Sequence, residues 1–191
     1  METSAFKSVV NKVTLIDDTA WNDFEQYFSK RTLRKNELLW AAGDVCRHLV
    51  FINYGIIRSF RYANAKEVSN QFFLEDSIFY DDVSFVSQKP CVNSYDALEE
   101  TEIIVIPRVA VNLMYDKYKS FERLGRLILE HNHILLVEAQ QNSKNQSSDE
   151  KYRQLMLEHP NILQRVPLKY IASYLNMTPE YLSKIRKGVC F

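Results

Sequence analysis

The chain has 191 residues, of which 46% are hydrophobic, and its 24 basic residues balance its 24 acidic ones. A chain of this length can bury the core of one large or two modest domains, and it has no apolar run near the roughly 18 residues that cross a membrane. The N-terminus lacks a secretory signal, and Cys46, Cys91 and Cys190 are too few and too scattered for a disulfide framework or a tetrathiolate metal site. We therefore expect a cytoplasmic globular protein.

Residues 5–30 mix apolar and polar side chains at helical spacing. Asp18 or Thr19 is a candidate N-cap for a helix that would bury Trp21, Phe24, Tyr27 and Phe28. This pattern predicts one helix of about ten residues.

From Arg31 onward the pattern changes to short runs typical of β-strands. The runs cover residues 33–44, 46–55, 56–65, 66–79, 93–100 and 101–108. Turn residues separate them about every ten positions: Gly43-Asp44, Asn53-Tyr54-Gly55, Ala63-Asn64-Ala65, Glu75-Asp76 and Glu99-Glu100. This spacing predicts an antiparallel β-barrel or jelly roll.

Helical spacing returns in residues 117–146. One apolar stripe is formed by Phe121, Leu124, Ile128, His131 and Leu135, and neighbouring apolar residues widen it. Such a helix can pack on its own barrel with one edge and on a second subunit with the other. The alternative is a helix buried wholly within one chain.

The segment after this helix is polar. Residues 139–149 are rich in Ser, Asn and Gln, which is typical of a hinge between domains. Ser147 or Ser148 is a candidate N-cap for a following helix, and Pro160 ends that helix.

Residues 167–187 fit two short amphipathic helices that meet at a tight corner. The apolar positions have the spacing of a helix-turn-helix: Ile171, Ala172, Leu175, Met177, Leu182 and Ile185. Asn176 stands at the corner, where its tolerance of the left-handed conformation is needed. Thr178 is a good N-cap for the second helix, and Pro179 suits its first position. The alternative is an ordinary αα-hairpin within a helical core.

Charge favours a role in DNA binding for this segment. Residues 161–191 contain five basic residues against one acidic residue, although the whole chain has no net charge. The second helix would present short or hydrogen-bonding groups to base edges, and the first helix would reach phosphate. The residues predicted to contact DNA are Lys169, Tyr170, Thr178, Pro179, Glu180, Ser183, Lys184, Arg186 and Lys187.

The order of these elements resembles the Crp/Fnr superfamily of bacterial transcription regulators. The segment QRVPLKYIASYLNMTPEYLSKIRK resembles their DNA-binding end, and RKNELLWAAGD followed by LVFINYGIIRSF resembles the first strands of their cyclic-nucleotide-binding barrel. The resemblance implies an α+β fold with an effector-type barrel and N-terminal helix in residues 1–116, a dimerisation helix and hinge in 117–146, and an all-α helix-turn-helix domain in 147–191. It also implies a homodimer that binds double-stranded DNA, with RNA polymerase as a further partner.

The family's phosphate-binding cassette is degenerate in this sequence. Tyr80-Asp81 stands where the family has Gly-Glu, Cys91-Val92 falls near the Arg and small hydroxyl residue, and Lys89 is the one cation of the segment. Because a buried phosphate needs a positive partner, we expect cyclic AMP not to bind. Residues predicted to line an effector pocket are Phe73, Tyr80, Asp81, Asp82, Lys89, Cys91 and Val92. Asp81 or Asp82 would bind a ribose-like hydroxyl or, alternatively, be a solvated loop carboxylate.

Other chemistries of such proteins lack the residues they need. Three cysteines cannot hold an iron-sulfur cluster in one subunit. His48, His131, His133 and Cys46 are candidate haem ligands, but single histidines are more often structural. The sequence contains no Gly-rich phosphate loop, HExxH or GxSxG motif, so we expect neither catalysis nor a resident cofactor or metal.

The leading hypothesis is therefore a homodimeric DNA-binding transcription regulator whose barrel senses an unidentified small molecule or none. The family's two-stranded wing is not seen after Lys187, so we expect backbone contacts to come from Lys169, Tyr170 and Arg186. The alternative is a ligand-binding or protein-interaction module that does not bind DNA.

Overall fold

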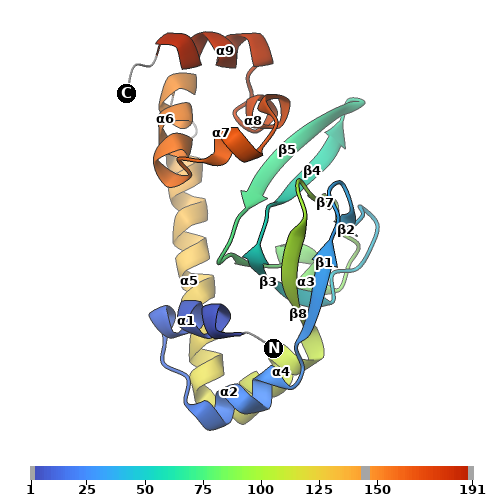
Figure 1. Ribbon diagram of the computed structural model, residues 1–191. Coiled ribbons are helices and arrows are strands. Elements are labelled where there is room, and N and C mark those ends of the chain that lie inside the picture. Colours follow the sequence, from blue (N-terminus) through green and yellow to red (C-terminus); the bar gives the residue numbers. More distant parts are fainter. Residues whose placement is uncertain (1–2, 143–146, 189–191) are drawn as a thin grey trace.

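The computed structural model describes residues 3–142 and 147–188. Figure 1 shows an elongated molecule in which a long helix, α5 (Lys119–Asn142), runs beside a β-barrel from one end to a group of C-terminal helices at the other. Within the described ranges, no helix is long and apolar enough to cross a membrane.

The N-terminal segment forms two helices where one was predicted. These are α1 (Ser4–Val13) and α2 (Asp18–Glu25). The N-cap of α2 is Asp17, whose carboxylate accepts a hydrogen bond from the Ala20 N–H at 2.9 Å, and not Asp18 or Thr19. Because α2 ends at Glu25, Tyr27 lies beyond it, while Phe28 is buried there against Phe24, 4.7 Å between ring centroids.

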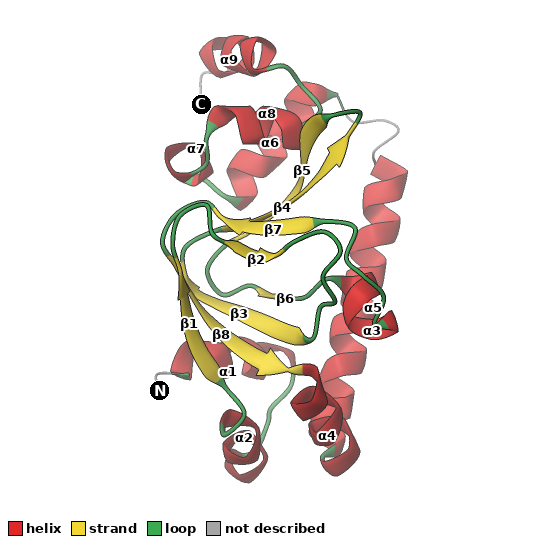
Figure 2. Cartoon of the chain, turned by 90° about the vertical axis from the view of Figure 1, so that its right-hand side faces the viewer, coloured by secondary structure: helices red, strands yellow, loops and turns green. Residues whose placement is uncertain are grey.

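The predicted jelly roll is confirmed as two four-stranded antiparallel sheets that face each other (Figure 2). The first has the order β1-β8-β3-β6, with bounds Ser29–Leu33, Thr101–Pro107, His48–Tyr54 and Ile78–Phe79. The second has the order β2-β7-β4-β5, with bounds Leu38–Trp40, Ser94–Ala97, Ile57–Ala63 and Lys66–Phe73. A short helix, α3 (Asp82–Ser87), interrupts the strands and was not predicted.

Two of the predicted turns contain residues with positive φ. Asn64 and Ala65 both have positive φ, as a two-residue hairpin turn between β4 and β5 requires. Gly55, with φ of 102°, joins β3 to β4, and a Cβ there would lie 2.4 Å from Thr101 Oγ1. This turn therefore needs glycine both for its conformation and for its close approach to β8.

The long helix buries part of the apolar stripe in its own subunit. Helix α4 (Arg108–Lys117) precedes it, and together with α1 and α2 it covers one half of α5 (Figure 1). Phe121 and Leu124 belong to the barrel-side core, and Ile128 packs partly against it. Phe121 and Leu124 are therefore core residues of their own subunit, which corrects their assignment to a dimer seam, whereas Ile128 is half-buried beside them. His131 is exposed, and the side chain of Leu135 lies outside the described residues.

The exposed apolar residues of α5 lie farther along and on an adjoining face. They are Leu129, Ile134, Leu136 and Val137. Leu129 and Leu136, 57% and 61% exposed, are one heptad apart and therefore share a face.

Within residues 147–188 the structure has four further helices, with bounds Ser148–Glu158 (α6), Ile162–Arg165 (α7), Leu168–Tyr174 (α8) and Pro179–Gly188 (α9). The predicted cap of α6 is Ser147, which forms a capping box with Glu150. The helix ends at Glu158, shortly before Pro160. Of the predicted hinge, residues 143–146 lie outside the described part of the chain.

Candidate functional site

The corner between α8 and α9 has the predicted helix-turn-helix packing. Asn176 has φ of 55°, and the Met177 N–H donates to the Ala172 carbonyl at 2.8 Å, which closes the turn. The core of the corner consists of Ile171, Ala172, Leu175, Leu182 and Ile185, all buried, with Met177 packed partly against them. Because each helix buries its apolar stripe against the other, the opposite face of α9 points outward.

Helix α9 begins as its sequence indicates. Thr178 Oγ1 accepts a hydrogen bond from the Tyr181 N–H at 3.2 Å, and Pro179 occupies the first helical position. This start fixes which side chains of α9 face away from the helix-turn-helix core.

The outer face of α9 brings together most of the predicted contact residues. Pro179, Glu180, Lys184 and Lys187 are exposed, Ser183 is half-buried, and Arg186 is exposed at the edge of this face. Glu180 and Lys184 do not form an ion pair with each other. The three basic side chains of α9 have no ion-pair partner among the described residues, so their charges are available to an anion.

Helix α8 contributes less to this face than predicted. Lys169, near its start, is exposed, but Tyr170 is half-buried and turned toward the barrel. Its ring lies over the guanidinium of Arg58 in β4, with Cζ 3.6 Å from the ring centroid. The tyrosine hydroxyphenyl is therefore held by the barrel in this arrangement, which does not support the predicted phosphate contact.

Arg58 is the centre of the contact between the barrel and α8. It is 1% exposed and donates two hydrogen bonds to the carboxylate of Asp96, at 3.0 Å and 2.8 Å. It also donates to Glu67 at 2.5 Å. A buried guanidinium needs such pairing because an uncompensated charge in the interior is costly. The sequence contained no local signal for this cluster, since its members lie on three strands and a helix.

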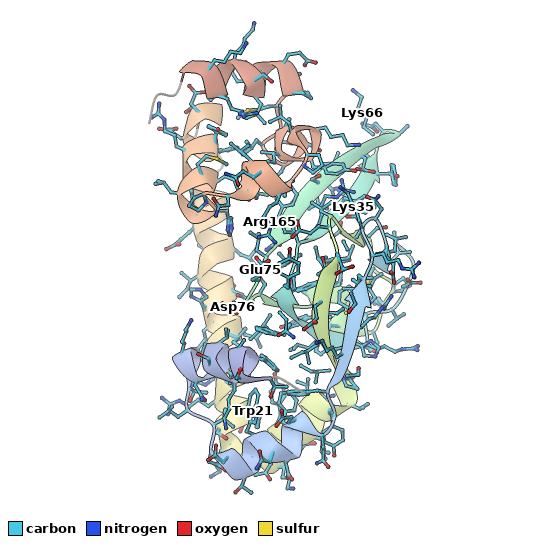
Figure 3. All side chains as sticks on the ribbon, viewed as in Figure 1. Trp21, Lys35, Lys66, Glu75, Asp76 and Arg165 are labelled. Carbon is cyan, nitrogen blue, oxygen red and sulfur yellow. The ribbon has the colours of Figure 1, made fainter. Side chains whose placement is uncertain are left out.

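A second charged cluster joins α7 to the turns of the barrel (Figure 3). Arg165 donates to Glu75 through two nitrogens, at 2.9 Å and 2.5 Å, and to Glu99 at 3.1 Å. The same Glu75 carboxylate accepts from the Gly55 N–H at 2.8 Å. Burial of this carboxyl opposes ionisation, but its bonds to Arg165 and Gly55 prevail and lower the pKa of Glu75.

The predicted effector residues do not come together as one pocket. Tyr80 stacks on Phe85, 4.5 Å between ring centroids, and burial raises its pKa to about 12. Asp82, Lys89 and Val92 are exposed, whereas Cys91 is buried, which raises the pKa of its thiol.

Asp81 is a structural residue of the barrel and not a solvated loop carboxylate. It is 6% exposed, caps α3 by accepting from the Ser84 N–H at 2.9 Å, and accepts from the Tyr95 hydroxyl at 2.8 Å. Both carboxylate oxygens thus have partners within the protein.

Aromatic rings occupy the space between the two sheets beside Asp81. Phe73 and Phe79 stack with centroids 4.2 Å apart, and Trp40 meets Tyr95 edge to face at 5.1 Å. A small apolar cavity of about 40 Å³ lies instead between the helices and the first sheet, with Leu49, Val111 and Ile128 in its wall.

Comparison with known proteins supports the fold. Residues 30–118 match the family model of the cyclic nucleotide-binding domain. No curated protein sequence is significantly similar to this chain.

Several solved structures share the architecture over most of the chain. A putative cAMP-binding regulatory protein from Silicibacter pomeroyi DSS-3 has a TM-score of 0.69 at 21% identity, covering 97% of this chain and 87% of its own. FixK2 from Bradyrhizobium japonicum has a TM-score of 0.67 at 16% identity, covering 84% and 83%. The catabolite activator protein of Thermus thermophilus has a TM-score of 0.58 at 15% identity, covering 92% and 84%. At these identities the similarity shows the fold, and the expected α+β fold is confirmed.

The Arg165 cluster predicts a pH dependence of stability. Because the pKa of Glu75 is lowered by folding, its contribution is present above the unfolded value of about 4.3 and is lost as the pH falls through the lowered value. We expect Arg165→Met to cost about 1–3 kcal/mol at pH 7. The cost should shrink below pH 4.

Urea unfolding of wild type and Arg165→Met at pH 7 and pH 3.5 measures this difference. Arg153→Met, an exposed change on α6, is the control for loss of a surface cation. An equal cost of Arg165→Met at both pH values would contradict the assignment.

Proposed function

We propose that the protein is a homodimeric DNA-binding transcription regulator, because residues 30–118 match the cyclic nucleotide-binding domain and the chain shares the fold of FixK2 and of a catabolite activator protein. The observation that carries the proposal is the outer face of α9. It presents exposed basic groups, without an ion-pair partner in the part of the chain that the structure describes, at the end of the molecule farthest from the N-terminal helices (Figure 1). In a helix-turn-helix this helix enters the major groove, where such groups meet bases and phosphates.

In this proposal, Glu180 and Lys184 recognise the base sequence of the DNA. Four residues apart on α9, they can reach neighbouring base pairs in one groove, Glu180 accepting from a cytosine amino group and Lys184 donating to guanine. Lys169 is exposed near the start of α8 and is assigned to phosphate, which carries no sequence information.

We expect Glu180→Ala and Lys184→Ala each to cost about 1–3 kcal/mol at one base pair and to relax specificity there. Lys169→Ala should weaken binding to all sequences alike and lower the salt slope by about one. Selection of bound sequences from a random DNA pool, with wild type and each variant, measures both effects. If Glu180→Ala selects the same DNA sequences as wild type, Glu180 does not contact a base. No binding or preference in wild type would favour the interaction-module alternative.

The second subunit of the proposed dimer packs on the exposed part of α5. Two-fold symmetric dimers bind half-sites about one turn of DNA apart, so one chain with one recognition helix is half of such a unit. Leu129 and Leu136 share a solvent-facing side of α5, and such apolar side chains are stabilised by burial against an equivalent helix.

We expect Leu129→Glu with Leu136→Glu to give folded monomers with much weaker DNA binding, because four carboxylates would meet in the dimer seam. Light scattering at micromolar concentration measures the mass. The control is Leu15→Glu with Leu157→Glu, which changes two exposed leucines outside α5. A wild-type protein that is already monomeric would contradict the assignment.

We do not expect the barrel to bind cyclic AMP. A cyclic phosphate in the cassette would lie near the carboxylate of Asp81, and the nearest cation of the segment, Lys89, is exposed to solvent. The buried Arg58 is already paired with Asp96 and Glu67. Without a free positive partner, a buried phosphate is strongly disfavoured.

We therefore expect isothermal titration calorimetry to show no micromolar binding of cyclic AMP or cyclic GMP to the wild type. Micromolar affinity for either nucleotide would contradict this expectation, and loss of that affinity in Lys89→Ala would identify the missing cation.

A further inference from the structure

The β4–β5 hairpin is fastened along α8. The Ser69 N–H donates to Ser173 Oγ at 3.0 Å, and that hydroxyl donates to the Glu67 carbonyl at 3.4 Å. Farther along, the ring of Phe72 packs against Tyr174 with centroids 5.4 Å apart. Together with the stack of Tyr170 on Arg58, these contacts fix the hairpin relative to the helix-turn-helix.

On the hairpin face that contacts α8, the acidic side chain of Glu67 already has a partner. Tyr62 is paired with Glu67 across the strands, and Arg58 binds the Glu67 carboxylate on this same face. Glu67 is therefore held by Arg58 on the face opposite to the one that carries Arg61 and Lys66.

The other face of the hairpin carries two basic residues near its closed end. In the register, Ala63 is opposite Lys66 and Arg61 is opposite Val68, so these four side chains share the face that does not contain Glu67. Arg61 and Lys66 are exposed, and neither forms an ion pair with any residue that the structure describes. Two neighbouring positive charges without a partner make this end of the hairpin attractive to an anion.

The closed end of the hairpin lies beside the helix-turn-helix. In Figures 1 and 2 it reaches the level of α8, beside the helix-turn-helix and below α9, and Figure 3 shows Lys66 at its tip. In a helix-turn-helix the first helix crosses the DNA backbone while the second lies in a major groove about 8.5 Å deep. An element fastened beside the first helix is therefore close to the phosphates that flank the site.

We propose that the closed end of the β4–β5 hairpin contacts DNA phosphates through Arg61 and Lys66, as an extension of the helix-turn-helix surface. This inference rests on the proposed function and adds a part of the barrel to the DNA interface. The contact is to the backbone, so it adds affinity for all sequences and leaves the base preference of α9 unchanged.

The test is a salt titration of DNA binding by the full chain. Each phosphate contact adds about 0.9 to the slope of log affinity against log salt. Arg61→Ala with Lys66→Ala should therefore lower the slope by about two and the affinity by roughly 10- to 60-fold at 0.1 M salt, with the selected sequence unchanged. Fluorescence anisotropy with the duplex that wild type selects provides these values.

The matched control is Lys35→Ala with Arg47→Ala. This pair also removes one lysine and one arginine, both exposed and outside the hairpin, so it tests the effect of net charge alone. Its slope should equal that of wild type. Arg61→Lys with Lys66→Arg keeps both charges and should also retain the wild-type slope, and thermal unfolding of each variant verifies the fold.

A second measurement uses a duplex shortened to the base pairs that α9 reads. Without flanking phosphates, the hairpin variant and wild type should bind equally.

Exposed charges on the edge strand β5 also discourage pairing with other chains, and that role alone predicts no change in the salt slope.

The outcomes separate the two proposals. A wild-type slope in the hairpin variant, or an equal loss in the control pair, overturns the hairpin contact and leaves the regulator proposal standing. Wild type that binds no DNA overturns the regulator proposal itself, and the hairpin contact with it.

Discussion

The pairing of one buried guanidinium determines how this chain is assembled. Arg58 has lost nearly all contact with water, so its charge must be neutralised by groups of fixed position. Asp96 in β7 and Glu67 in β5 supply the carboxylates, and Tyr170 in α8 covers the planar cation with its ring. Three neighbouring strands and the first helix of the helix-turn-helix are thereby held in one arrangement.

The second consequence of this contact is a shared hydrophobic core. Ile56, Phe72 and Leu98 of the barrel belong to the same buried cluster as Tyr152, Leu155 and the core of the helix-turn-helix. Arg165 adds an ion cluster with Glu75 and Glu99 at the edge of this core. The C-terminal helices therefore pack directly on the barrel.

In the interior of the barrel, too, the buried charge has partners within the protein. Asp81 is satisfied by the N-terminus of α3 and by the Tyr95 hydroxyl, and stacked rings occupy the space between the sheets. An anionic ligand would have to displace rings and face a carboxylate. The filled interior makes the barrel a rigid support for the helix-turn-helix that packs on it.

Local physics explains which features could be predicted from the sequence alone. The corner and its outward face could be predicted because each feature depends on a few neighbouring residues. These features are the left-handed Asn176, the capping Thr178 and Pro179 in the first helical turn. Strand and turn periodicity likewise identified the jelly roll. Only the tertiary structure decided that Tyr170 faces Arg58 and that Phe121 and Leu124 are core residues. The same apolar stripe suits a subunit seam or an intramolecular core, and which one forms depends on the elements, here α1, α2 and α4, that the chain folds against it.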